Sequence, residues 1–126
     1  MKWIGMIRAL VIVALMVLIV HAVQAKEEPT ELNSEVVEIQ EILQNESAYD
    51  GKYVLIEGII DTECPSGCWF ILNDGTASIY VDILPNNFVI PQKRGSNAKV
   101  YGKVTTREGD PMMIGKMVEI GGAIYQ

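Results

Sequence analysis

Histidine is almost absent from this sequence of 126 residues. Its one histidine, His21, lies in an apolar N-terminal segment, and no imidazole follows it. A domain without imidazole cannot form the usual serine or cysteine triads or offer the nitrogen ligands that zinc and haem commonly take. The sequence therefore excludes most familiar hydrolase mechanisms, indicates no cofactor, and predicts that the protein is not an enzyme.

Positive charge is scarce at the N-terminus, where Lys2 and Arg8 are the only charges before the unbroken apolar run from Ala9 to Val20. A basic start, an apolar run of about a dozen residues and a small residue before the cut are typical of a secretory signal peptide. We predict a signal peptide over residues 1–25, cleaved after Ala25, and an exported protein: periplasmic, in the cell envelope or extracellular. The alternative is an uncleaved anchor with the domain facing outside, although the run is shorter than the roughly 20 residues that span a bilayer.

Removal of residues 1–25 leaves 126 − 25 = 101 residues, enough for one small domain and too few for two. Eight basic residues then face sixteen acidic ones, a net charge of −8, and no stable membrane span remains. Residues 26–33 are acidic, contain Pro29 and show no periodicity, so we expect a tether there.

An amphipathic helix is predicted over residues 34–44, with Asn33 or Ser34 as its N-cap. Apolar residues recur there at spacings of four, three and four, while glutamates occupy the other faces. The apolar positions are Leu32, Val36, Ile39 and Leu43.

From residue 53 the apolar period falls to two, which predicts strands. We expect five strands, over residues 53–60, 68–72, 76–84, 98–105 and 112–120. The first is long, and its central Gly58 permits a bulge or a bend. Asn73-Asp74-Gly75 predicts a tight hairpin turn, and residues 107–111 predict another.

This pattern, carried by "YDGKYVLIEGII", "GCWFILNDGTASIYVDI", "AKVYGKVTTREG" and "MMIGKMVEI", resembles the OB-fold. The resemblance implies an all-β fold, a five-stranded Greek-key barrel, here preceded by the N-terminal helix within one domain over residues 34–126. Many OB domains carry a helix between strands three and four. The segment "PNNFVIPQKRGSN", with Pro85 and Pro91, predicts a loop instead.

Cysteine is also scarce, and its two copies stand together in "CPSGCW", residues 64–69. This motif resembles small exported OB-like proteins of unknown function whose first hairpin carries a cysteine, three residues, and then Gly-Cys-Trp. That resemblance implies location and fold but no activity.

Three roles fit Cys64 and Cys68, which flank a three-residue turn. Facing hairpin Cβ atoms lie about 4.5 to 5.5 Å apart, close to the 3.5 to 4.5 Å of a disulfide, so we expect a structural disulfide. Redox exchange is the second role, opposed by Asp61 and Glu63, whose charge raises a thiol pKa. A soft metal such as Cu(I), with Met112 or Met113 as thioether ligand, is the third. Two thiolates alone make no zinc site, and we predict no metal.

A ligand surface is predicted on the outer face of the barrel. Alternation turns apolar residues such as Phe70 and Val81 inward, and it turns aromatic residues outward. OB domains bind ligands on strands two and three and in the adjoining loops. The candidate ligand-binding residues are Trp69, Ile71, Tyr80, Tyr101, Lys99, Lys103 and Arg107. The alternative is that the N-terminal helix or a second subunit covers this surface.

Charge is unevenly distributed along the chain. Two basic residues face thirteen acidic ones over residues 26–92, whereas six face two over residues 93–116. The basic stretch permits nucleic-acid binding, but the net charge of −8 opposes it. Three alternating carboxylates, Glu57, Asp61 and Glu63, suit an inverting hydrolase or a calcium site, although a solvated strand face is the simpler interpretation.

The sequence thus predicts an exported, non-enzymatic OB-fold module that binds an unknown protein or small ligand. An oligonucleotide- or oligosaccharide-binding protein is the first alternative. A metal-binding or thiol-redox protein is the second.

Overall fold

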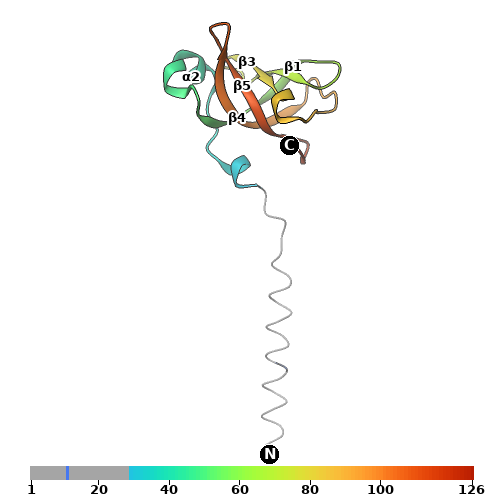
Figure 1. The fold of residues 1–126 in the computed structure, drawn as a ribbon. Helices are drawn as coiled ribbons and strands as arrows, with labels where there is room; N and C mark the ends of the chain where they lie inside the picture. Colours follow the sequence, from blue (N-terminus) through green and yellow to red (C-terminus); the bar gives the residue numbers. More distant parts are fainter. Residues whose placement is uncertain (1–10, 12–28) are drawn as a thin grey trace, which may run out of the picture.

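A computed structural model describes residue 11 and residues 29–126 of the chain (Figure 1). The predicted signal peptide and its cleavage site lie outside the described residues, apart from residue 11. Within the described part, no helix has both the length and the apolar character needed to cross a bilayer. The helical elements are η1 (Thr30–Asn33), α2 (Ile39–Gln44), α3 (Glu46–Tyr49) and η2 (Leu84–Asn86). The strands are β1 (Tyr53–Glu63), β2 (Trp69–Asn73), β3 (Ser78–Asp82), β4 (Asn97–Arg107), β5 (Asp110–Ile120) and β6 (Ala123–Tyr125).

The strands form a closed barrel with OB-fold topology. Their order is β3-β2-β1-β4-β5-β6, all neighbours are antiparallel, and a parallel pairing of β3 with β5 closes the barrel. The predicted all-β, five-stranded Greek-key fold preceded by a helix is confirmed. The short β6 was not predicted, because three residues after Gly121-Gly122 carry too little alternation to be recognised.

The barrel core follows the predicted alternation. Phe70 and Leu72 of β2, and Ile79 and Val81 of β3, are buried in it together with Val54 and Ile56 of β1. Burial of such side chains is the main stabilising contribution to a domain of this size.

The irregularity of β1 lies beyond the glycine at which a bulge or bend was predicted. Its register against β2 shifts between Ile60 and Thr62, two residues beyond Gly58. Gly58 has another role, because a Cβ atom there would overlap the Asn73 carbonyl. The glycine therefore lets the β2–β3 turn lie close against β1.

The N-terminal helix is shorter than predicted. Residues 34–38 are not helical: Val36 bridges Leu55 of β1, and the Val37 N–H donates to the Leu55 carbonyl at 2.8 Å. Two consecutive β-branched valines suit this extended pairing better than a helix. Ser34 and Asn33 are consequently not the N-cap of α2, whose N-cap is Glu38.

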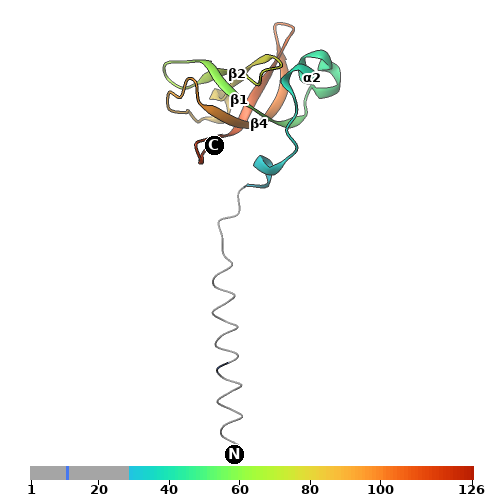
Figure 2. The same ribbon diagram turned by 180° about the vertical axis from the view of Figure 1, so that it is seen from behind.

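The N-terminal segment packs against the barrel at two places. Ile39 and Ile42 of α2 enter the main core, and Figures 1 and 2 place α2 at one end of the barrel. Leu32 of η1 is buried outside the barrel wall against Leu55 and Met117. The last four residues of the predicted tether are therefore folded onto the domain.

Asp74, in the β2–β3 turn, caps α2, although it lies 35 residues after Ile39 in the sequence. The Ile39 N–H donates to Asp74 Oδ2 at 2.8 Å, and the Gln40 N–H donates to Thr76 Oγ1 at 3.2 Å. Partial burial raises the pKa of Asp74, but hydrogen bonds from Ile39, Thr76 and Ala77 outweigh it and hold the pKa below its usual 3.8. The charged carboxylate thus joins the hairpin to the helix.

Replacement of Asp74 by Ala should lower the free energy of unfolding by about 1 to 2 kcal/mol, as loss of an N-cap does. The folded-state pKa is depressed, so this stabilisation is complete above the unfolded-state value and is lost as pH falls through the folded value. Urea unfolding of D74A from neutral to acid pH measures it, with the exposed Asp61→Ala as control. Equal stability of D74A and D61A at neutral pH would contradict the capping role.

Candidate functional site

Trp69 and Tyr80 form an aromatic pair on the outer face of β2 and β3. The register sets Trp69 opposite Asp82 and Ile71 opposite Tyr80, so the two rings are diagonal neighbours. Their centroids lie 5.4 Å apart with the planes at 28°. Both side chains are half-exposed, so one edge of a stacking surface faces solvent.

Arg107 extends this pair into the β4–β5 hairpin. Its Cζ lies 5.8 Å from the centroid of the Tyr80 ring, within cation–π distance. A pocket of about 200 Å³ opens beside the tyrosine. It is lined by Tyr80, Arg107, Glu108, Asp110, Pro111 and Met112.

The Tyr80 phenol stays protonated at neutral pH. Burial and the nearby Asp82 carboxylate raise its pKa above the usual 10, although Arg107 acts in the opposite direction. The hydroxyl can therefore donate a hydrogen bond to a ligand in the pocket. We call Trp69, Ile71, Tyr80 and Arg107 the aromatic face.

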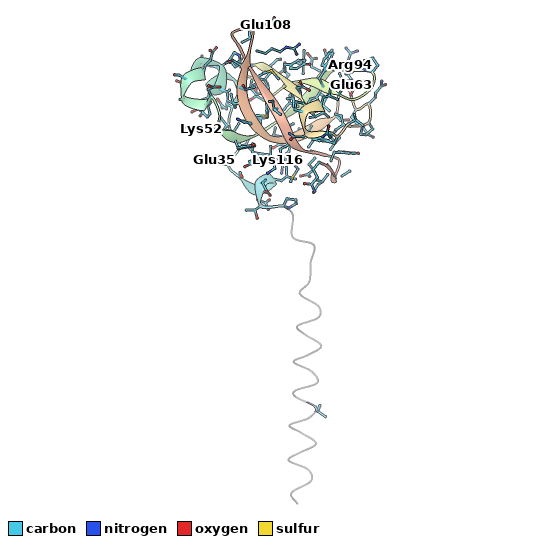
Figure 3. All side chains as sticks on the ribbon, in the orientation of Figure 1. Glu35, Lys52, Glu63, Arg94, Glu108 and Lys116 are labelled. Carbon is cyan, nitrogen blue, oxygen red and sulfur yellow. The ribbon has the colours of Figure 1, made fainter. Side chains whose placement is uncertain are left out.

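The other three predicted ligand-binding residues lie elsewhere, on the outer side of β4. Tyr101 stacks on Tyr53 with centroids 5.6 Å apart and packs against the cluster around Leu32. Lys103 pairs with Tyr53, and Lys116 Nζ lies 5.8 Å from the Tyr53 ring centroid. Figure 3 shows Lys116 on the lower side of the barrel, away from Glu108, which lies at the tip of the β4–β5 hairpin at the top.

Lys99 is placed between two acidic residues. Its cross-strand neighbours are Glu57 of β1 and Glu119 of β5. Opposite charges across strands stabilise a sheet. Lys99 therefore balances acidic residues of the two neighbouring strands. Neither Lys99 nor Lys103 joins the aromatic face, whereas Arg107 at the end of β4 does.

The N-terminal segment covers the outer side of β4 around Tyr101 and leaves the aromatic face uncovered. Leu32 of η1 packs in the cluster that includes Tyr101. α2 instead places Ile39 and Ile42 in the main core and hydrogen-bonds to Asp74 and Thr76 of the β2–β3 turn. The aromatic face keeps its partial exposure. Sequence reasoning missed the pocket residues Glu108, Asp110, Pro111 and Met112, whose only signal was their place in the loop between strands four and five.

Cys64 and Cys68 face each other across the β1–β2 turn. Their Sγ atoms lie 2.7 Å apart, closer than the van der Waals contact of two sulfur atoms and within reach of a disulfide bond, although no bond joins them. Ser66 Oγ lies 3.1 Å from the Cys64 sulfur and 3.7 Å from that of Cys68. Both cysteines are half-exposed.

The expected increase in the Cys64 pKa is wrong. Hydrogen bonds from Cys68 and then from Ser66 lower the pKa of Cys64 from 9.0 to about 6, and the bond to Cys64 raises the pKa of Cys68. The Glu63 carboxylate is occupied, because it accepts the Lys93 and Arg94 N–H groups at 2.9 Å each. Local hydrogen bonding therefore outweighs the charges that the sequence places beside the thiol.

The turn that carries the cysteines is held by hydrogen bonds to the β3–β4 loop. Ile90 donates its N–H to the Gly67 carbonyl at 3.1 Å, and Gln92 Nε2 donates to the Pro65 carbonyl at 2.8 Å. Gly67 has φ +75°, and a Cβ atom there would overlap the Ile90 carbonyl. The predicted loop between strands three and four is confirmed, with only the short η2 in it.

The thioether ligands considered for a soft metal do not stand beside the cysteines. Met113 is fully buried in the core, and Met112 lines the pocket beside Tyr80. Among the described residues no group of three or more His, Cys, Asp or Glu side chains could hold a metal.

The three acidic residues of β1 do not form one site. Glu57 and Asp61 line an open groove of about 560 Å³ with Asp74, whereas Glu63 binds the β3–β4 loop. The groove lies along the strand face, and its Asp74 already caps α2.

No family model and no curated protein sequence matches this chain. Solved structures do match it. The hypothetical protein ygiW from E. coli has a TM-score of 0.50 and 18% identity, over 70% of this chain and 91% of its own. Asparaginyl-tRNA synthetase from Pyrococcus horikoshii has a TM-score of 0.58 and 23% identity over 71% of this chain, which spans 23% of the synthetase chain. A chain of the S. pombe Stn1-Ten1 complex has a TM-score of 0.53 and 12% identity, over 77% of this chain and 80% of its own. At these identities the likeness shows the fold alone.

Proposed function

We propose that this protein is an exported, non-enzymatic OB-fold binding module whose ligand site is the aromatic face. The observation that carries the proposal is the half-exposed stack of Trp69 on Tyr80 beside a pocket. It lies on strands two and three next to the loop between strands four and five, where OB-folds bind their ligands.

The chemistry of the site favours a ring-bearing ligand. Stacked aromatic side chains offer flat apolar area, and the Tyr80 hydroxyl and the Arg107 guanidinium offer donors at its edge. The ligand is the aromatic side chain of a partner protein or the ring of a small molecule such as a sugar.

Nucleic acid is the second candidate. One protein of similar structure is a tRNA synthetase by name, and Arg107 beside Tyr80 is a suitable pair for a phosphate and a base. Glu108 and Asp110 line the pocket together with this one arginine, Asp82 lies near Tyr80, and the full chain has a net charge of −6. These charges repel a polyanion, so we expect no oligonucleotide binding at physiological salt.

Titration with three probes tests the proposal: a phenylalanine-containing peptide, a neutral oligosaccharide and a homothymidine oligonucleotide. We expect saturable binding of the peptide or the oligosaccharide, with little change on addition of salt. If only the oligonucleotide binds, with affinity that falls steeply with salt, the nucleic-acid candidate replaces the first.

Export is proposed from the N-terminal sequence alone. The mature protein should begin at Lys26, and in an oxidising compartment we expect Cys64 and Cys68 to be joined as a disulfide. Intact-mass measurement on protein from its own cells checks both. A mass that retains residues 1–25 would favour the anchored alternative.

A further inference from the structure

The sulfur atoms of Cys64 and Cys68 are arranged asymmetrically. The two Sγ atoms lie 2.7 Å apart, and Ser66 Oγ lies 3.1 Å from the Cys64 sulfur but 3.7 Å from the Cys68 sulfur. A hydrogen bond from the Ser66 hydroxyl therefore stabilises a thiolate on Cys64 more than one on Cys68. The lowered pKa of Cys64, about 6, agrees with this geometry.

The turn does not depend on a sulfur–sulfur bond for its shape. The Cys64 N–H donates to the Trp69 carbonyl and the Gly67 N–H donates to the Cys64 carbonyl, both at 2.9 Å. The bonds from Ile90 and Gln92 hold the turn from the other side. Both the dithiol and the disulfide therefore fit the same backbone, and closing so short a loop removes little chain entropy.

We propose that Cys64 and Cys68 are a thiol–disulfide exchange site that reacts with low-molecular-weight thiols and disulfides. Cys64 is the attacking cysteine and Cys68 is the resolving one. Ser66 is a positioning residue that stabilises the Cys64 thiolate. The proposal goes beyond ligand binding and does not rest on it.

The exchange proceeds in two steps. The Cys64 thiolate attacks one sulfur of a disulfide reagent, so that a mixed disulfide forms and one thiolate leaves. The Cys68 thiol gives its proton to that thiolate and attacks the Cys64 sulfur, so that the Cys64–Cys68 bond forms and a second thiolate leaves. The two cysteines lose two electrons, and the reagent gains them.

Glutathione disulfide is the probe for a test on reduced protein from its own cells. After quenching with an alkylating agent, mass analysis should show that Cys68→Ser accumulates one glutathione at Cys64. Its rate should exceed that of Cys64→Ser by about tenfold or more, because the thiolate is the nucleophile. The unsubstituted protein should pass on to an internal disulfide, and millimolar glutathione should reduce that disulfide again.

Ser66 offers the matched variant. Ser66→Ala should slow adduct formation at Cys64 in the Cys68→Ser background several-fold while the unfolding midpoint stays unchanged, and Ser66→Thr should restore the rate. Equal rates for the two cysteine variants, or an internal disulfide that resists glutathione, would overturn the proposal. Those outcomes would identify an inert structural disulfide and leave the binding site untouched.

Discussion

Replacement of Trp69 or Tyr80 by Ala is expected to weaken binding of a ring-bearing probe by about 10- to 100-fold, equivalent to about 1 to 3 kcal/mol per stacked ring. Each ring forms one half of the stack, with centroids 5.4 Å apart, and Tyr80 also carries Arg107 over its face. Loss of Tyr80 removes the pocket wall as well, so its effect should be the larger. Isothermal titration calorimetry with the probe that binds measures both.

The control for this pair is the second aromatic stack of the molecule. Tyr53 is 53% exposed and stacks on Tyr101 on the β4 side of the barrel. Tyr53→Ala therefore removes a ring that is more exposed than Trp69 or Tyr80 without touching the aromatic face, and the affinity of this variant should stay at the unsubstituted value. A larger loss in Tyr53→Ala than in Tyr80→Ala would move the binding site to β4.

Replacement of Gly67 by Ala should lower the free energy of unfolding by about 3 kcal/mol. The left-handed backbone alone costs a residue with a Cβ about 1 to 2 kcal/mol. The new Cβ would also overlap the Ile90 carbonyl, a backbone atom that moves only with its loop. Denaturant unfolding measures the loss, and rapid thiol reaction of Cys64 should fall with it, because the turn is displaced.

Replacement of Gly75 distinguishes the cost of the left-handed backbone from the cost of the overlap with the Ile90 carbonyl. It has φ +88°, and nothing lies within 4 Å of a Cβ built there. Gly75→Ala should therefore cost only the conformational part, about 1 to 2 kcal/mol. If the two glycine variants were equally stable, the contact between the cysteine turn and the β3–β4 loop would not contribute to stability.

The barrel could be predicted because its signals are local. Alternation over β1 to β5 assigns inward residues such as Phe70 and Val81, and the turn residues Asn73 to Gly75 mark the hairpin. The helix boundary could not be predicted in the same way. Val36 and Ile39 have helical spacing, but pairing of residues 36 and 37 with Leu55 is a long-range contact that the spacing does not encode.

The candidate site, too, could be predicted only as far as its signals are local. Alternation predicts that Trp69, Tyr80, Tyr101 and Lys103 point outward, but it does not say which of them share a surface of a closed barrel. Pairing of β3 with β5 brings the β4–β5 hairpin to Tyr80, and η1 covers the side of Tyr101. The thiol chemistry was misjudged for a similar reason, because charges adjacent in sequence matter less to Cys64 than the hydrogen bonds that the folded turn supplies.

The central claim is that the ligand binds on the aromatic face, and an NMR titration of the ¹⁵N-labelled protein with the bound probe tests it most directly. We expect saturable shifts at the Trp69 indole N–H and at the Tyr80 and Arg107 amides, with the Tyr53 and Tyr101 amides unchanged. Shifts centred on Tyr53 and Tyr101, with the Trp69 indole unmoved at saturation, would contradict the account.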